Sequence, residues 1–266
     1  MKKLLSKGFV LFMMIGLLVA CGTDNQEQTS TDTGNNNNND GKKILKMATS
    51  ADFAPFESYN PDGEMVGFDI ELAEMIAEEL GYELQIEDMK FDGLIGALQA
   101  ERVDMVMSGM SADEKRRENV DFSIEYNESS EMLLSVKDSP IKDLESLTGK
   151  TIGVQLGSIQ EEGAERLGEQ YDFEVKKIDD GPMIIQELIS NRIDVAYMDK
   201  DVAIGYLEAQ DLYGFDDPTS SSPGMAVAFP KGSDLVDDVN NVLEKLEENG
   251  ELQSLKDKWL TEKESE

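Results

Sequence analysis

The chain places an arginine and an aspartate after two apolar segments, where they could bind a small zwitterion. Arg116 lies in a short helical pattern, residues 113–119, which follows the turn SGMS at residues 108–111. Such a turn exposes backbone N–H groups and a hydroxyl, and a guanidinium grips a carboxylate with two parallel hydrogen bonds. Asp199 follows the apolar residues 195–198 and could hold an ammonium group. Together the two side chains describe a site for a dipolar molecule.

Both residues also have an ordinary structural interpretation, which local sequence leaves open. Arg116 could pair with Asp113 or Glu114 on a solvated helix, because ion pairs at this spacing are common on surfaces. Asp199 could cap a helix that begins near Asp201.

Two aromatic residues are further candidates. Phe53 and Phe91 could stack on the alkyl part of a ligand, and the alternative for both is ordinary packing in the core.

The composition restricts the chemistry that the chain can perform. The 266 residues include no histidine and one cysteine, Cys21. This excludes histidine-activated nucleophiles, intrachain disulfides and thiolate metal clusters, so we expect no cofactor and no metal. Asp plus Glu number 56 against 24 Lys plus Arg, a formal net charge of −32. Because so acidic a surface repels nucleic acids, the composition favours a small-molecule binding protein over an enzyme or a nucleic-acid partner.

Residues 1–20 have the pattern of a secretion signal. Lysines precede an uncharged, mostly apolar run at residues 8–20, which is too short to span a bilayer core of about 30 Å. The run ends LVAC at residues 18–21 and resembles the lipobox of bacterial lipoproteins. The resemblance implies cleavage before Cys21, lipidation of its sulfur by groups such as palmitate, and a protein tethered to the outer face of the cytoplasmic membrane. The alternative is an ordinary signal peptide.

A linker and an alternating pattern follow the signal. Residues 21–42 carry too few apolar side chains to offset the entropy cost of ordering and predict a flexible linker. Beyond them, short apolar segments alternate with amphipathic ones, which is typical of βαβ units and a largely parallel sheet. Strands are expected at residues 44–48, 84–86, 103–107, 151–155, 173–178 and 195–198. Helices are expected at residues 69–80, capped by Asp69 and ended at Gly81, and at 94–100, 113–119, 159–167, 183–191, 235–249 and 251–259.

A weak internal repeat predicts two similar lobes. Residues 97–107 and 187–197 share the order of helix, Arg-apolar-Asp and strand. The alternative is that any helix-to-strand turn has this chemistry. Two such lobes would face each other across a cleft, because ligands of open α/β sheets bind beyond the carboxyl ends of the strands. The candidate residues then lie at 50–53, 108–111, 155–158 and 199.

Several motifs resemble, in order and spacing, one known family. They are ATSADFAPFE (48–57), GFDIELA (67–73), FDGLIGAL (91–98), GMSADEKRRENVDFS (109–123), LTGKTIGVQ (147–155), FPKGS (229–233) and KW (258–259). Over about residues 43–262 the chain is similar to the extracellular solute-binding proteins of family 3, the polar amino-acid receptors of ABC importers.

The resemblance implies a periplasmic-binding-protein-like α/β fold of type II, with two crossover strands and a ligand cleft between two lobes. Lobe one would comprise residues 43–127 and 223–266, and lobe two residues 128–222. By the same resemblance, Arg116 clamps an α-carboxylate and Asp199 holds an α-amino group. With the candidates at the strand ends, the expected ligand-binding residues are Ser50, Phe53, Phe91, Ser108, Gly109, Ser111, Arg116, Gln155, Ser158 and Asp199.

The resemblance also implies partners. They are an ABC permease and an amino acid, bound by a monomer. Many relatives that hold a cationic or amide side chain have an acid at the position of Ser50, so we expect glutamine or a similar polar neutral amino acid, with arginine next. The alternatives are an amino-acid sensor or chemoreceptor partner, and a small-molecule dehydratase on the same fold that uses Asp199 or Glu57 as acid or base.

Overall fold

The computed structural model describes residues 42–128 and 130–260. The secretion signal, Cys21 and the linker up to residue 41 therefore lie outside the described residues. None of the helices in these two ranges has the length and apolar character needed to cross a membrane.

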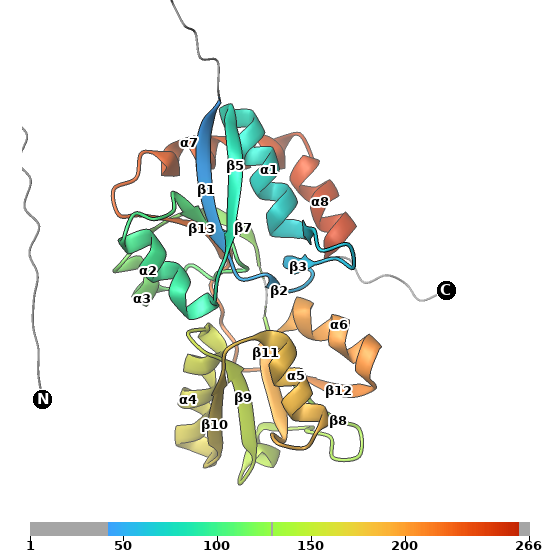
Figure 1. The fold of residues 1–266 in the computed structure, drawn as a ribbon. Coiled ribbons are helices and arrows are strands. Elements are labelled where there is room, and N and C mark those ends of the chain that lie inside the picture. The colour runs from blue at the N-terminus through green and yellow to red at the C-terminus, as the bar shows by residue number, and fades with distance from the viewer. Residues whose placement is uncertain (1–41, 129, 261–266) are drawn as a thin grey trace, which may run out of the picture. The chain divides into compact units, whose positions relative to one another are not determined.

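The strands form two five-stranded sheets, one in each lobe (Figure 1). The first sheet has the order β5 (Tyr82–Asp88), β1 (Lys43–Thr49), β6 (Met105–Val106), β13 (Met225–Phe229), β7 (Asp121–Asn127). The second has the order β10 (Glu174–Ile178), β9 (Thr151–Gln155), β11 (Val195–Asp199), β8 (Glu131–Val136), β12 (Leu212–Asp216). In both sheets the first three strands are parallel and the last two pair antiparallel. We call the two parts the first and the second lobe.

Helices pack on both faces of each sheet because alternate strand residues point to opposite faces. In β1, Met47 packs in a core with α1 (Phe68–Leu80), α7 (Leu235–Glu248) and α8 (Glu251–Trp259). Its neighbour Ala48 packs in a separate core with α2 (Leu94–Gln99).

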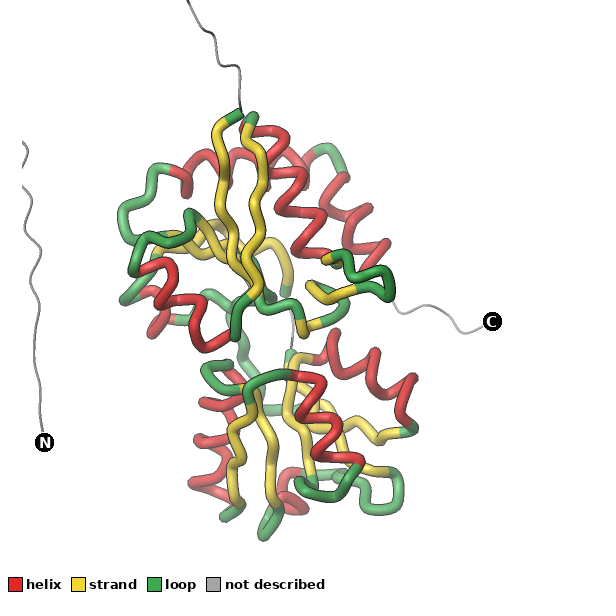
Figure 2. Tube along the Cα trace, in the orientation of Figure 1, coloured by secondary structure: helices red, strands yellow, loops and turns green. Residues whose placement is uncertain are grey.

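The second lobe also has helices on both faces of its sheet (Figure 2). Its helices are α4 (Ile159–Tyr171), α5 (Gly181–Ile189) and α6 (Lys200–Gln210). Short elements complete the fold: α3 (Glu114–Arg117), the 3₁₀ turns η1 (Phe91–Gly93) and η2 (Leu144–Leu147), and a small sheet of β2 (Asp52–Phe53), β3 (Glu57–Tyr59) and β4 (Met65–Val66).

The internal repeat is confirmed by matching hydrogen bonds in the two lobes. Before β6, the Asp104 Oδ2 accepts from the backbone N–H of Lys46 at 2.8 Å. Before β11, the Asp194 Oδ2 accepts from the backbone N–H of Thr151 at 2.9 Å. Each aspartate stands one residue before its strand and joins it to the neighbouring parallel strand, in the middle of β1 and at the start of β9.

The expected helix cap at Asp69 is wrong. Helix α1 begins at Phe68, its N-cap is Gly67, and Asp69 is fully buried inside the first turn. The first N–H groups of the helix need no capping side chain, because the backbone N–H groups of Phe68 and Asp69 donate to the carbonyls of Pro55 and Phe56. The Asp69 carboxylate is left to bind elsewhere.

Most of the strands that the sequence patterns did not predict lie next to the two points where the chain passes from one lobe to the other. The chain passes from β7 in the first sheet to β8 in the second, and returns from β12 to β13. As a result, the antiparallel strands of each sheet come from distant parts of the sequence, and the expectation of a largely parallel sheet holds for three strands of each five-stranded sheet.

Candidate functional site

A cavity between the lobes gathers eight of the ten candidate ligand-binding residues. Its empty volume is about 290 Å³, a measure that includes space open to solvent. The lining residues are Phe53, Phe91, Gly109, Ser111 and Arg116 from the first lobe, and Gln155, Ser158, Ile159, Gln160 and Asp199 from the second.

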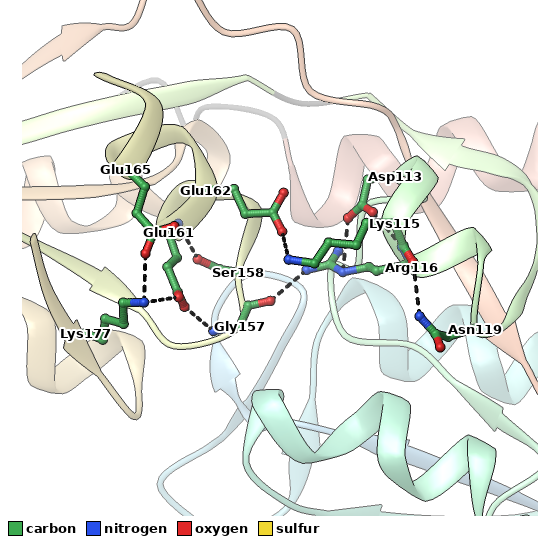
Figure 3. A network of polar contacts seen from close by, with 10 residues as sticks. All are labelled: Asp113, Lys115, Arg116, Asn119, Gly157, Ser158, Glu161, Glu162, Glu165 and Lys177. Carbon is green, nitrogen blue, oxygen red and sulfur yellow. Dashed lines mark hydrogen bonds and ion pairs between the residues drawn. The ribbon is translucent and has the colours of Figure 1, made fainter. Parts of the chain in front are cut away.

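Arg116 enters the cavity from α3 and is nearly buried, with a side chain that is 10% exposed. Its Nε pairs with Asp113 at 3.2 Å, its Nη1 donates to the carbonyl of Ser111 at 2.8 Å, and its Nη2 donates to the carbonyl of Gly157 at 3.0 Å (Figure 3). Burial lowers the pKa of this guanidinium, and the charge of Asp113 opposes that shift. A guanidinium has five N–H groups, so one donor on each terminal nitrogen is left for a ligand.

The pairing of Arg116 with Asp113 does not compete with a binding role. The Asp113 Oδ1 also accepts from the backbone N–H of Arg116 at 2.8 Å and caps α3. The same carboxylate therefore fixes the helix start and the direction of the guanidinium. The Arg116 guanidinium also lies over the ring of Phe91, 5.4 Å from its centroid.

The loop that carries Ser111 depends on a glycine. Gly109 has a φ of 52°, and a Cβ built there would lie 2.6 Å from the Phe53 ring. Only glycine combines this left-handed backbone with so close an aromatic contact. The loop therefore holds Phe53 against the cavity while Ser111, 5% exposed, lines it.

The second lobe contributes the start of α4. Ser158 caps this helix by accepting from the backbone N–H of Glu161 at 3.1 Å. Ile159 and Gln160 follow it into the cavity lining. Because a helix N-terminus exposes N–H groups and carries partial positive charge, this end favours a bound carboxylate.

Asp199 lines the same cavity and is 4% exposed. Its Oδ1 accepts from the backbone N–H groups of Asp201 at 2.9 Å and Val202 at 3.4 Å, which caps α6. The two interpretations of this residue are therefore compatible: Asp199 is a helix cap whose position also brings a carboxylate to the cavity.

Two candidates lie beside the cavity rather than in its lining. The Ser108 hydroxyl donates to Glu57 Oε1 at 2.7 Å and accepts from the backbone N–H of Ser50 at 3.0 Å. The Ser50 hydroxyl donates to Asp52 Oδ1 at 2.9 Å. Both serines thus support the loops that line the cavity.

Asp52 lies in the candidate range 50–53, but the sequence did not single it out as a site residue. Its Oδ2 accepts from Gln155 Nε2 and from the backbone N–H of Gly181, both at 3.2 Å and both across the lobes. Burial raises the pKa of its carboxyl group, and the nearby Asp180 charge adds to this, while Ser50 and Gly181 oppose it by hydrogen bonding. An acid therefore reaches Gln155, which lines the cavity, although Ser50 itself is not an acid.

Other contacts join the lobes around the cavity. Lys115 pairs with Glu162 beside the Arg116–Gly157 hydrogen bond (Figure 3), and Lys90 pairs with Asp180 at 3.1 Å. Lys90 and Lys115 are exposed, so each pair contributes about 0–1 kcal/mol.

Comparison with known proteins agrees with this architecture. A model of the bacterial extracellular solute-binding proteins, family 3, matches residues 45–262. The arginine-binding extracellular protein ArtP of Bacillus subtilis (strain 168) is 44% identical over 247 residues, which cover 92% of this chain and 92% of ArtP.

Solved structures agree as well. An ancestral arginine-binding protein bound to arginine has a TM-score of 0.79 at 36% identity and covers 83% of this chain and 99% of its own. An ancestral arginine-binding protein bound to glutamine has a TM-score of 0.77 at 35% identity, with coverages of 82% and 98%. The relatives named here are binding proteins with the two-lobed fold. The chain therefore belongs to the bacterial extracellular solute-binding proteins of family 3.

Proposed function

We propose that the protein is a lipid-anchored receptor on the outer face of the cytoplasmic membrane that captures a polar amino acid and delivers it to an ABC importer. The observation that carries the proposal is the cavity with Arg116 on one side and Asp199 on the other. Opposite charges contributed to one cavity by the two lobes fit a free zwitterion, whose two charged groups must both find partners when water is removed.

The carboxylate end of the ligand would bind at Arg116. The two remaining guanidinium donors, the Ser111 hydroxyl and the N–H groups at the start of α4 all lie at the cavity wall. The ammonium end would bind at Asp199, and Phe53 and Phe91 would cover the alkyl part.

Capture would occur by closure of the lobes. The ligand would touch residues of both lobes, so it would favour the closed arrangement over an open one. Contacts across the lobes, such as Arg116 to Gly157 and Gly181 to Asp52, would form in the same step. We propose the lobe boundaries near residues 127/128 and 222/223, between β7 and β8 and between β12 and β13.

For the ligand we now place arginine ahead of glutamine, which reverses the order expected from Ser50. Asp52 supplies a carboxylate beside Gln155, although the sequence analysis did not single out this aspartate. The relatives named above include proteins described as binding arginine, and one bound to glutamine. An acid near the side-chain end of the cavity favours a cationic side chain.

The central experiment is calorimetric titration of residues 42–266 with a panel of L-amino acids. We expect L-arginine and L-glutamine to bind, with arginine tighter, and D-arginine and agmatine, which lacks the carboxylate, to bind much more weakly. Failure of every amino acid in the panel to bind would overturn the proposal.

The anchor has its own test. Full-length protein with Cys21→Ser, expressed in a Gram-positive bacterium, should appear in the medium, whereas the wild type and a control with Ser30→Ala stay with the membrane fraction. Membrane retention of both variants would argue against lipidation at Cys21.

A further inference from the structure

Two fully buried carboxyl groups lie behind the loop that lines the cavity, and the zwitterion site does not use them. They are Glu57 in β3 and Asp69 in the first turn of α1, both 0% exposed. The Glu57 Oε1 accepts from the Ser108 hydroxyl at 2.7 Å. The Asp69 Oδ2 accepts from the backbone N–H of Gly109 at 2.7 Å and from the Tyr126 hydroxyl at 2.8 Å.

The second oxygen of each group has no donor if both carboxyls are ionised. Glu57 Oε2 and Asp69 Oδ1 are buried and have no hydrogen-bond partner, and the two groups are close enough to shift each other's pKa. Among the described residues no lysine or arginine pairs with either group. Two negative charges in this position would be buried without compensation, which is prohibitive, whereas one proton between them removes one charge and satisfies both oxygens.

We propose that Glu57 carries a proton and donates it in a hydrogen bond to Asp69, and that this singly ionised pair positions the ligand-binding loop at residues 108–111. Glu57 is the protonated partner because Asp69 accepts two further hydrogen bonds, which stabilise its charge, whereas Glu57 accepts one. Glu57 and Asp69 are not in the lining of the cavity described above and are positioning residues.

The pair connects three segments of the first lobe. Through Gly109 it holds the loop that lines the cavity, and through Ser108 it reaches the backbone of Ser50, just before Phe53. Through Tyr126 it holds β7, the strand after which the chain passes into the second lobe. Loss of the shared proton would therefore disturb the cavity wall and the crossing strand together.

The charged and titratable surroundings agree with a single proton. Burial raises the pKa of Glu57 well above its ordinary value, and the charges of Asp69 and Asp52 raise it further, while the Ser108 hydrogen bond opposes the shift. Burial likewise raises the pKa of Asp69, opposed by its hydrogen bonds to Gly109 and Tyr126. Burial also raises the pKa of the Tyr126 hydroxyl, so that it remains a donor. A raised pKa means that the proton is kept to a higher pH than on an exposed carboxyl group, and is lost as the pH rises.

Infrared spectroscopy can detect the proton without any ligand. The wild type should show the carbonyl band of a protonated carboxylic acid at neutral pH, and Glu57→Gln should lack it. A wild type without this band overturns the proposal, as does a band that persists in the variant. Because this measurement needs no ligand, it tests the shared proton of Glu57 and Asp69 even if the proposed function is wrong.

Binding of L-arginine tests the positioning role and rests on the proposed function. Glu57→Gln places an N–H donor toward Asp69 and an acceptor toward Ser108, so it should retain affinity within about threefold. Glu57→Leu removes the donor proposed for Asp69 Oδ1 and the acceptor of the Ser108 hydroxyl, and should bind at least about tenfold more weakly. Equal weakening in both variants, or in neither, contradicts the shared proton as the positioning device.

The pH profile provides a further arm, which remains informative if Glu57→Leu does not fold. Arginine affinity of the wild type should fall more steeply toward alkaline pH than that of Glu57→Gln. The ligand's own ammonium titrates identically in both titrations, so the difference between the two profiles reports the pair. Identical profiles would count against the proposal.

Discussion

The two lobes place opposite charges after equivalent strands. In the first lobe, β6 leads into the loop of Ser111 and then to Arg116, whereas in the second lobe β11 leads directly to Asp199. The strands themselves are held alike, by Asp104 and Asp194 on the backbone of β1 and β9. The two lobes thus repeat the same strand arrangement but carry different charged residues at the ends of the equivalent strands. This difference is what makes the cavity fit a molecule with two opposite ends.

The lobes also differ in how they hold these charges. Asp199 is fixed by the backbone N–H groups at the start of α6, which stabilise its charge. Arg116 depends on side chains and loops: Asp113 orients it, and Glu57 and Asp69 hold the neighbouring loop. The carboxylate end of the cavity should therefore be the more easily damaged of the two.

Arg116→Ala tests the carboxylate end of the cavity and should have the largest effect on binding. Removal of the guanidinium leaves a bound carboxylate without its main partner, which costs about 2–5 kcal/mol, or at least thirtyfold in affinity. The matched control is Arg117→Ala, because Arg117 is the next residue but packs over Phe122 and does not line the cavity. Titration calorimetry with L-arginine should find the loss in the first variant and near-normal binding in the second; equal affinities would remove Arg116 from the site.

Asp199→Asn tests the opposite end. Asparagine caps helices as well as aspartate does, so α6 should persist while the charge for the ammonium is lost. We expect amino-acid affinity to fall about tenfold or more, since hydrogen bonds to charged groups contribute about 1.5–3 kcal/mol. Asp143→Asn makes the same change at the cap of η2, outside the cavity, and should leave binding unchanged. A similar loss in both variants would make the effect structural rather than electrostatic.

Gly109→Ala tests how far the first lobe depends on its loop. The new Cβ would need to displace the Phe53 ring. The alanine would also have to keep a φ of 52°, which costs about 1–2 kcal/mol for a residue with a side chain. We expect a lower melting temperature and about tenfold weaker binding. Gly81→Ala is the control for backbone strain alone, because Gly81 has a φ of 75° with no atom near a built Cβ. It should lower the melting temperature but spare affinity.

The sequence predicted what depends on local pattern. Short apolar segments located the three parallel strands of each five-stranded sheet, and the Arg-apolar-Asp repeat predicted two lobes of one architecture. Polar residues after strands led to Arg116 and Asp199, which the structure brings to one cavity. These inferences succeeded because strand ends in α/β sheets point to a common edge, whatever the rest of the chain does.

The parts that sequence reasoning missed depend on contacts between distant residues. Asp69 has the local signature of a helix cap, but its partners are Gly109 and Tyr126, separated from it by 40 and 57 positions. Asp52 gains its role through Gln155, 103 positions away. Ile159 and Gln160 line the cavity because α4 begins there, and neither residue type indicates a binding role by itself.

Asp52→Asn gives the smallest expected effect and decides the choice between ligands. Asparagine retains an oxygen for the N–H groups of Gln155 and Gly181, so closure and the zwitterion contacts should persist. Only the negative charge beside the side-chain end is lost. Because the carboxylate is partly exposed, arginine affinity should fall by about threefold to fivefold while glutamine affinity stays the same. The control is Asp88→Asn, which removes one negative charge from an exposed carboxylate that accepts from the backbone N–H of Ala51. It tests whether the loss of any nearby negative charge weakens arginine binding. If both ligands weaken equally in Asp52→Asn, the residue acts through lobe closure and the preference for arginine must come from another part of the cavity.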